Sequence, residues 1–209
     1  MTLCTKTLFC APDAPPSPAD LSAIAVGVAS GKIIVFPTDT VYGIGTTARN
    51  NSARERLYAL KDRDPRKALP ILVHSLDDAR LWAEFTPEAE ILARKYWPGA
   101  LTLVLSVTRK GRRIVSEGAA TIALRIPALA LTRELIELSG VPWATTSANR
   151  SGEPACADGT AAADVFSGRV DFIVDAGPGA GQPSTVVDAT GGTLKILRAG
   201  ALSASEVLG

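Results

Sequence analysis

Four polar segments and two arginines of this 209-residue chain carry the side chains that could do chemistry. Guanidinium groups bind phosphate or carboxylate through two parallel hydrogen bonds, and lysines add point charge. The residue types therefore favour an anionic, phosphate-bearing ligand. Each segment follows an expected strand or helix and offers hydroxyls, amides or cations; they are residues 37–45, 61–67, 145–149 and 183–185, and the arginines are Arg125 and Arg198.

The segment 32–45, KIIVFPTDTVYGIG, has the form of a strand that ends at a site. Its apolar residues IIVF predict a buried strand, and the hydroxyls of Thr38 and Thr40 follow directly. Gly43 and Gly45 let the backbone turn sharply and come close to a ligand. Such a loop after a strand is a common place for a site in α/β proteins. An ordinary strand followed by a tight turn is the alternative interpretation.

Some of the cations fit an ordinary exposed loop, and others do not. Lys61, Arg63 and Lys67 also fit a solvated charged loop. Arg125 ends the apolar strand TIALR, where a charge needs a partner because its unpaired burial is costly. Arg125 is therefore the stronger indication of a ligand.

Several familiar catalytic motifs are missing from the sequence. There is no G-x-x-x-x-G-K-[ST] phosphate loop, no G-x-G-x-x-G after a strand and no G-x-S-x-G nucleophile elbow. His74 is the only histidine, which excludes a two-histidine metal site and is more typical of a structural role. Asp39 could contact magnesium, but one carboxylate is weak evidence for a metal site.

Composition excludes other classes of protein. The chain is 46% hydrophobic and 21% charged, as in soluble globular proteins, and its net charge of +1 gives no overall field for nucleic acid. It has no apolar run long enough to cross a membrane and no signal-peptide pattern. The cysteines Cys4, Cys10 and Cys156 lack metal-binding spacing, so we expect reduced thiols in a cytoplasmic protein.

Alternating helix and strand patterns predict an α/β fold with a mixed sheet. Ser17 caps a first helix at Pro18, and the Gly191-Gly192 turn predicts an antiparallel hairpin. The proline-rich residues 1–16 are expected to form a flexible arm before one domain at 17–209. Further helices are expected near residues 51–61, 76–85, 87–97, 128–138 and 157–166, and strands near 33–36, 69–73, 101–107, 121–125, 141–144, 171–175, 185–188 and 194–197.

Six short motifs, in order along nearly the whole chain, resemble the YrdC/TsaC family of threonylcarbamoyl-AMP synthases. The chain ends soon after the last of them and is similar to the short, single-domain form. The motifs are PTDTVYGIG, Lys61-x-Arg63, RIP at 125–127, Ser147-Ala148-Asn149, Ser184-Thr185-Val186 and LRAG at 197–200.

This resemblance implies a twisted mixed sheet with flanking helices around a deep, positively charged cavity. It also implies a nucleotidyltransferase that joins L-threonine, bicarbonate and ATP, with magnesium (Mg²⁺) on the phosphates, and releases pyrophosphate. The product, threonylcarbamoyl-adenylate, would pass to partner proteins that modify an adenosine of tRNA, with at most a weak tRNA contact by this chain and no membrane partner.

The resemblance also implies roles for individual residues. Lys61 and Arg63 would be the catalytic cations that neutralise phosphate charge. The loop departs from the family's usual prolines at Asp64 and Ala68. L-Threonine would contact Thr38, His74, Arg125, Thr145 and Ser184, and ATP would contact Lys61, Arg63, Lys67, Thr121, Ser147, Asn149 and Arg198.

Two other functions remain open at this stage. One is a carbamoyl-adenylate-forming enzyme, as in hydrogenase-maturation carbamoyltransferases, although those chains carry zinc-finger cysteine pairs that are absent here. The other is an RNA-binding module that uses the basic stretches TRKGRR and DRDPRK. A net charge of +1 argues against a spread basic surface, and binding through such a surface would depend strongly on salt.

Overall fold

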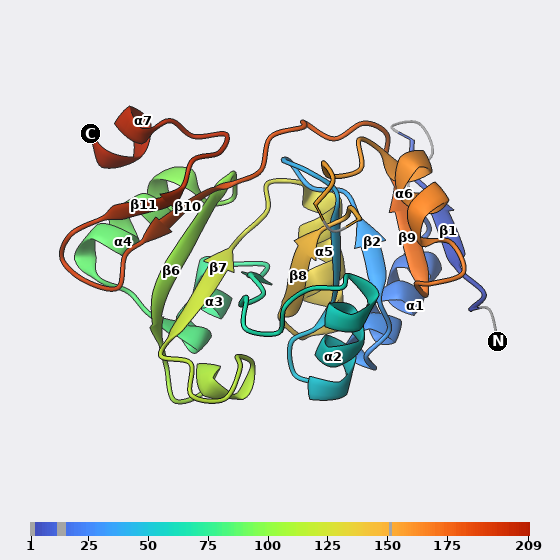
Figure 1. Cartoon of the computed structure of the whole chain (residues 1–209), viewed down its shortest axis with the longest axis horizontal. Coiled ribbons are helices and arrows are strands. Elements are labelled where there is room, and N and C mark those ends of the chain that lie inside the picture. The colour runs from blue at the N-terminus through green and yellow to red at the C-terminus, as the bar shows by residue number, and fades with distance from the viewer. Residues whose placement is uncertain (1–2, 12–15, 151) are drawn as a thin grey trace.

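A computed structural model describes residues 3–11, 16–150 and 152–209 and confirms the α/β fold with a twisted mixed sheet. The strands are β1 Lys6–Phe9, β2 Ile34–Phe36, β3 Gly43–Thr47, β4 Ile71–Leu72, β5 Ala83–Glu84, β6 Leu101–Val107, β7 Thr121–Arg125, β8 Trp143–Ser147, β9 Phe172–Asp175, β10 Thr185–Asp188 and β11 Lys195–Arg198. They form one sheet in the order β1-β9-β2-β3-β8-β4-β7-β6-β10-β11, with β5 paired to β6 (Figure 1). β4 pairs in parallel with β7 and antiparallel with β8, so both directions occur.

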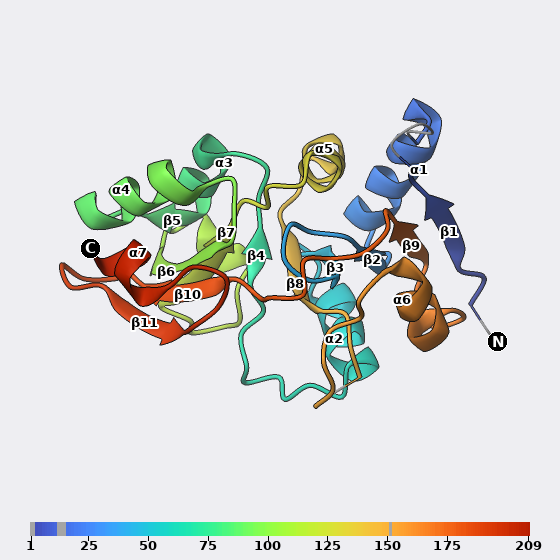
Figure 2. The same ribbon diagram turned by 90° about the horizontal axis from the view of Figure 1, so that it is seen from above.

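Helices cover both faces of this sheet. Figure 2 shows α1 and α5 on one face and α2 and α6 on the other. The side chain of Ser17 caps α1 as expected, because it accepts the backbone N–H of Asp20 and so satisfies a free donor of the first turn. The helices are α1 Pro18–Ala29, α2 Asn51–Leu60, α3 Leu76–Trp82, α4 Pro87–Tyr96, α5 Ala130–Ser139, α6 Gly159–Phe166 and α7 Ala204–Leu208, with a 3₁₀ turn η1 at Gly111–Arg113.

Two apolar clusters hold the layers together. Leu21 and Ile24 of α1 pack with Leu135 of α5 against Phe36 and Trp143, whose rings meet edge to face at 5.2 Å. The larger cluster fills the space between the sheet and helices α2, α3, α4 and α6. These contacts position the strand ends that carry the polar side chains.

Two segments expected as loops are strands. Gly43 to Thr47 forms β3, antiparallel to both β2 and β8, and Thr145 to Ser147 completes β8. A side chain at Gly43 would meet the ring of Phe36 at 2.7 Å, so glycine is required here for close packing rather than for a turn. The two glycines of β3 hide its strand character because glycine is uncommon in strands.

The expectation of a flexible arm is wrong for residues 6–9. This segment forms β1, whose residues pair in parallel with β9 from Lys6 opposite Phe172 to Phe9 opposite Asp175. The hydroxyl of Thr5 adds a 2.6 Å hydrogen bond to Val170 O. Backbone pairing with a strand more than 160 residues away therefore orders this part, while Pro12 and Pro15 lie outside the described residues.

Candidate active site

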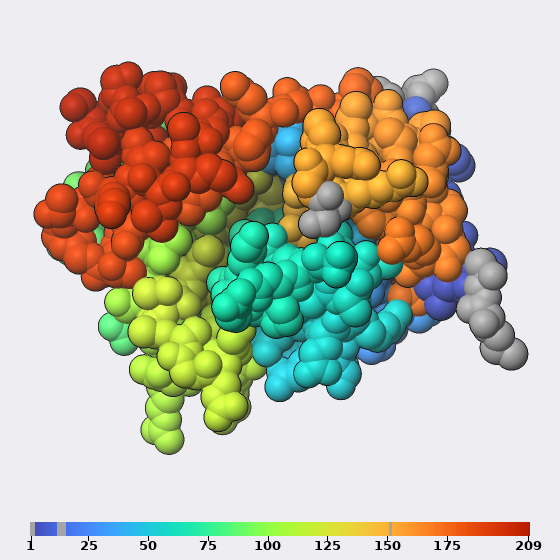
Figure 3. Space-filling model, in the orientation of Figure 1, coloured from blue at the N-terminus to red at the C-terminus, as the bar shows by residue number. Residues whose placement is uncertain are grey.

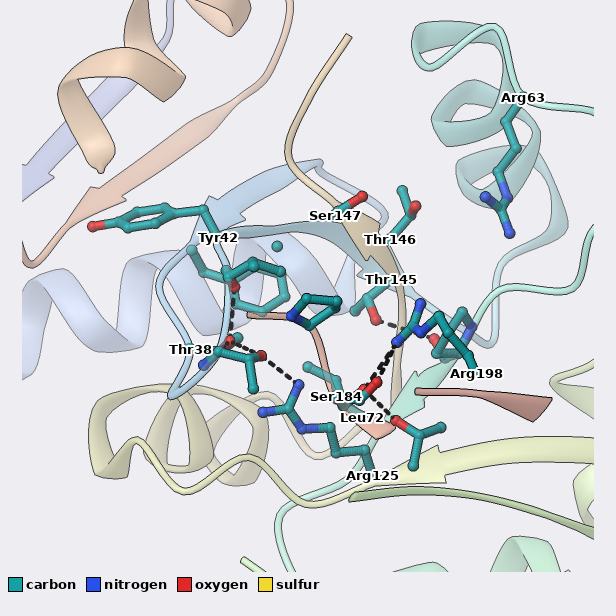
Figure 4. A pocket seen from close by; sticks show the side chains of 17 residues that line it. Thr38, Tyr42, Arg63, Leu72, Arg125, Thr145, Thr146, Ser147, Ser184 and Arg198 are labelled. Carbon is teal, nitrogen blue, oxygen red and sulfur yellow. Dashed lines mark hydrogen bonds between the residues drawn. The ribbon is translucent and has the colours of Figure 1, made fainter. Parts of the chain in front are cut away.

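A cavity of about 310 Å³ lies where the loop after β2 meets the ends of β7, β8 and β11. Its volume is at the lower end of the range for small-molecule pockets. Figure 3 shows the hollow between the teal segment after α2, the red C-terminal strands and the orange segment after β8. The residues expected from the sequence that line it are Thr38, Arg63, Arg125, Thr145, Ser147, Ser184 and Arg198 (Figure 4).

The lining of this cavity is cationic. Arg63, Arg125 and Arg198 contribute to it, and within the described ranges no aspartate or glutamate does. Charges in a partly enclosed space act more strongly than in bulk water. The cavity is therefore suited to a ligand with more than one anionic group.

Arg125 is the buried cation of the cavity, with 6% of its surface exposed. Its Nε donates to Gly99 O at 2.9 Å and its Nη1 donates to Thr40 Oγ1 at 2.7 Å. Its Nη2 lies 2.8 Å from Asp39 Oδ1, but without the alignment of a hydrogen bond. A guanidinium has five N–H donors, and the two hydrogen bonds leave one N–H on Nη1 and those of the buried Nη2, beside Asp39, without an aligned acceptor in the described structure.

Burial and a neighbouring carboxylate act on Arg125 in opposite directions. Burial lowers the pKa of the guanidinium, and the charge of Asp39 partly offsets this effect. Asp39 Oδ1 also accepts the backbone N–H of Ala128 at 2.8 Å. Asp39 is thus committed to fixing Arg125 and the start of the α5 segment.

Arg198 and Ser184 form the opposite wall. Arg198 Nη2 donates to the backbone oxygen of Ser184 at 2.7 Å and approaches its hydroxyl at 3.2 Å. The Ser184 hydroxyl lies 2.8 Å from Thr102 Oγ1 on β6. Figure 4 shows Ser184, Thr145 and Arg198 directed toward the same space. The pKa of Arg198 is lowered by burial.

Lys61 joins the end of α2 to the end of β8. Its ammonium donates to the backbone oxygen of Asn149 and, at 2.6 Å, to Asn149 Oδ1, which also accepts the Ser147 hydroxyl at 2.9 Å. Burial lowers the pKa of Lys61 to about 8; Cys156 opposes the shift, and Arg63 and Arg169 add to it. Lys61 and Asn149 line a neighbouring depression, and they reach the main cavity through Ser147.

Besides Lys61 and Asn149, three more of the expected residues do not line the main cavity. Thr121 lines a second, largely apolar cavity of about 170 Å³ beside Ile122. Lys67 is exposed, and His74 Nδ1 lies 3.3 Å from Asp78 Oδ2 rather than in the lining. The segment around Lys67 is shaped by Asp64, which makes a two-bond pair with exposed Arg66.

Two residues of the cavity, Thr40 and Thr102, were not predicted from the sequence as site residues. In the sequence, Thr40 stands out only as a hydroxyl residue close to Thr38. Its hydrogen bond with Arg125 joins segments that are 85 residues apart. Thr102 interrupts the apolar strand LTLVLSV, which is the sequence signal that could have identified it. Both positions depend on pairing between distant strands.

The described ranges contain no group of three or more histidine, cysteine, aspartate or glutamate side chains that could hold a metal ion. Asp39, the carboxylate paired with the cavity residue Arg125, also accepts the backbone N–H of Ala128. The donor set therefore fits a magnesium ion only if phosphate oxygens supply most of its ligands. Cys4, Cys10 and Cys156 are free thiols. Among the helices described, none combines the length and apolar character that crossing a bilayer requires.

Comparison with known proteins gives consistent similarities. The family model Sua5/YciO/YrdC, described as "Telomere recombination", matches residues 28–200. The chain is 39% identical to threonylcarbamoyl-AMP synthase of Pyrococcus abyssi over 187 residues, which cover 88% of this chain and 55% of that protein. It is 36% identical to a Mycobacterium tuberculosis protein provisionally named for the same activity, over 98% of this chain and 96% of that one.

A solved structure from the same family has a similar fold. The structure of Pyrococcus abyssi Sua5 complexed with L-threonine superposes with a TM-score of 0.89 at 35% identity, over 97% of this chain and 59% of that one. The chain spans about half the length of the first curated relatives, 55% and 52%. The similarity therefore extends over most of this chain but over only part of those longer proteins.

Proposed function

The chain belongs to the Sua5/YciO/YrdC family, and on this premise we propose that it is a threonylcarbamoyl-AMP synthase. The reaction would join L-threonine, bicarbonate and ATP into threonylcarbamoyl-adenylate and release pyrophosphate. The observation that carries the proposal is Arg125, a buried guanidinium with free donors in a cavity that two further arginines line. This arrangement suits one small carboxylate next to a set of phosphates.

The amino-acid substrate would occupy the Arg125 end of the cavity. Arg125 would bind its carboxylate, and the hydroxyls of Thr145 and Ser184 would bind its polar groups. Thr145 Oγ1 donates to Pro70 O at 3.1 Å and keeps its acceptor sites for a ligand. His74 is held by Asp78 instead and has no place in this proposal.

ATP would occupy the side toward Ser147. Lys61, Arg63 and Arg198 supply positive charge there, and the second cavity beside Thr121 has the apolar lining and size to take the adenine ring. Asn149 would hold Lys61 and Ser147 in place. Magnesium would arrive on the triphosphate as part of the substrate. Lys67 is exposed and would contribute only to the local field.

The chemistry requires positioning rather than a protein nucleophile. The threonine amine and bicarbonate condense to N-carboxy-threonine with loss of water, and the new carboxylate attacks the α-phosphate of ATP while pyrophosphate leaves. Fixed cations stabilise the charge that spreads over the phosphate oxygens. Binding the reactants side by side supplies the remaining part of the rate enhancement.

The product would pass to tRNA-modifying proteins, and we propose a weak contact of this chain with tRNA. The turn at η1 carries four exposed cations, Arg109, Lys110, Arg112 and Arg113. None of them joins an ion pair with any residue that the structure describes. Such a turn favours contact with phosphates. The free thiols favour the reducing cytoplasm as the place of the reaction.

The test is pyrophosphate release from ATP, with L-threonine and bicarbonate omitted in turn. Release that requires both supports the synthase. Release that is indifferent to threonine, or absent altogether, contradicts it and favours a carbamoyl-adenylate enzyme or an RNA-binding module. Ser147→Ala should reduce release at least tenfold because it removes a hydroxyl of the ATP side, whereas Ser22→Ala on an exposed face of α1 should not.

A further inference from the structure

Helix α2 carries both of the expected catalytic cations at its C-terminal end. Lys61 is the residue that caps the helix, and Arg63 follows two positions later. Asp62 between them has a φ of 46°, in the left-handed region. A left-handed residue directly after the cap ends many helices, because it lets the next N–H groups turn back onto the last carbonyl oxygens. The way in which this helix end is held therefore determines where Lys61 and Arg63 lie.

The last four carbonyl oxygens of a helix need partners from outside its regular ladder. In α2 the residues that directly follow the helix supply three of these partners. Their backbone N–H groups turn back at 3.0 to 3.2 Å onto the oxygens of Leu57, Tyr58 and Ala59. The fourth oxygen, on Leu60, accepts Nη2 of Arg169 at 3.1 Å, from a residue 109 positions further along the chain.

A guanidinium suits this place for an electrostatic reason. The aligned peptide dipoles leave partial negative charge at the C-terminal end of a helix, and a cation there is stabilising. The last turn of α2 contains no basic residue, and the ammonium of Lys61 is directed to Asn149 instead. Arg169 follows α6, which lies on the same face of the sheet as α2 (Figure 2). Arg169 thus supplies both the missing charge and the missing donor.

The loop that carries Arg169 is fixed on both sides by one hydroxyl. Thr5 Oγ1 donates to Val170 O at 2.6 Å and accepts the backbone N–H of Gly168 at 2.8 Å. An anchored backbone reduces the conformational freedom that a side chain loses when it forms a bond. The segment that leads into β1 therefore helps to keep Arg169 at the end of α2.

Arg169 also lies close enough to Lys61 for its charge to act there. The two residues line the depression beside the main cavity, which has a volume of about 220 Å³, and the ring of Phe166 lies 5.9 Å from Lys61 Nζ. Burial is the main cause that lowers the pKa of Lys61 to about 8; Cys156 opposes the shift, and the charges of Arg63 and Arg169 add to it. Arg169 therefore influences Lys61 through the backbone of α2 and through its charge.

We propose that Arg169 is a positioning residue, which holds the C-terminal end of α2 so that Lys61 and Arg63 face the phosphates of ATP. Arg169 does not line the main cavity, and it acts through the backbone oxygen of Leu60 rather than on a substrate. The inference rests on the proposed function for the identity of the nucleotide.

Arg169→Ala tests the proposal, and the variant should fold because this side chain is exposed. The KM for ATP should rise about fivefold, the effect of one ordinary hydrogen bond, while the KM for L-threonine changes less than about twofold. Arg169→Lys keeps the charge and a donor, so it should recover most of the affinity for ATP. Arg94→Ala, at an exposed position of α4, is the control and should leave both KM values unchanged.

The pH profile is a second readout, because it follows the charge of Arg169. Loss of a neighbouring cation raises the pKa of Lys61, so the fall in kcat/KM for ATP should move to higher pH in Arg169→Ala. Arg169→Lys should return it to the position of the wild type. A purely structural role would instead lower the melting temperature, raise both KM values together and leave the profile in place.

The proposal is overturned if Arg169→Ala keeps the KM for ATP within twofold of the wild type, if both KM values rise alike, or if lysine does not restore the affinity for ATP. Failure of the proposed function is seen separately, as pyrophosphate release by the wild type that needs no threonine.

Discussion

The unusual residues of this molecule are its buried cations. Arg125 and Lys61 are each 6% exposed, and of the two only Arg125 forms an ion pair with a described residue, Asp39. Lys61 is bonded to the neutral oxygens of Asn149 and lies 5.9 Å from the ring of Phe166. Burying an ammonium ion without a counter-charge destabilises the fold. An anionic ligand would relieve this cost, so the site is poised to bind phosphate.

The lowered pKa of Lys61 predicts how activity depends on pH. Lysine is charged below its pKa, which burial brings down to about 8, so the charge that binds ATP is lost as the pH rises through about 8. The kcat/KM for ATP should therefore fall above this pH, since this quantity reports groups of the free enzyme. The measurement is pyrophosphate release at saturating threonine between about pH 6.5 and 9.5.

Lys61→Arg is the matched variant for this experiment. Arginine stays protonated throughout that range, so the descent above pH 8 should disappear in the variant even if its activity is lower. A wild-type profile that stays flat to about pH 9.5 would show that the Lys61 charge is not needed for ATP.

At the scale of single elements, β3 decides how closely the strands of the site approach. It lies between β2 and β8, and it carries glycine at positions 43 and 45. A side chain at Gly45 would lie 2.8 Å from both Ala144 O and Thr145 Cγ2. The backbone oxygen cannot move aside without breaking the pairing of β3 with β8, so this glycine is required for Thr145 to reach the cavity.

Gly45→Ala is expected to destabilise the fold by about 1–3 kcal/mol, the usual effect of overpacking. The measurement is urea unfolding, and the threonine KM should rise as well because Thr145 is displaced. Gly191→Ala is the control, since nothing lies within 4 Å of that position, and it should change stability by less than about 0.5 kcal/mol. Equal stability of the two variants would contradict the role given to β3.

At the scale of the whole molecule, the sheet brings together segments that are far apart in the chain. The cavity draws residues from both halves, with Thr38 after β2 and Ser184 before β10. The basic turn at η1 is separate from this cavity, and Figure 3 shows the yellow-green segment that contains it projecting from the lower edge of the molecule. It is anchored by Thr108, which contacts backbone oxygens of Leu81 and Trp82. Charge on a rigid projection can contact a large polyanion without obstructing the site.

Reversing two of these charges, as Lys110→Glu with Arg113→Glu, should weaken tRNA binding and reduce its salt dependence. Each lost phosphate contact lowers the slope of log K against log salt by about one, so the change should be close to two. Threonine-dependent pyrophosphate release should not change. Arg94→Ala on α4, an exposed position, is the control. If this variant loses as much tRNA affinity as the double variant, the basic turn is not a specific tRNA contact.

The residue types, the helix starts and the hairpin followed from the sequence because they depend on neighbours a few positions apart. The Ser17 cap, β7 at 121–125 and the antiparallel pair β10 and β11 were predicted in this way and are confirmed. Caps, apolar periodicity and turn glycines act within one or two turns of chain. The family is likewise readable from the sequence, because each of its motifs is a short run of adjacent residues.

The tertiary structure decided what each polar residue can contact. β1 pairs with the distant strand β9, and β3 is held between its neighbour β2 and the distant strand β8. Pairing with a distant strand is a property of the assembled sheet, and the residues next to β1 or β3 do not specify it. For the same reason, the sequence could name Thr38 and Arg125, but only the fold placed Thr40 within hydrogen-bond distance of both.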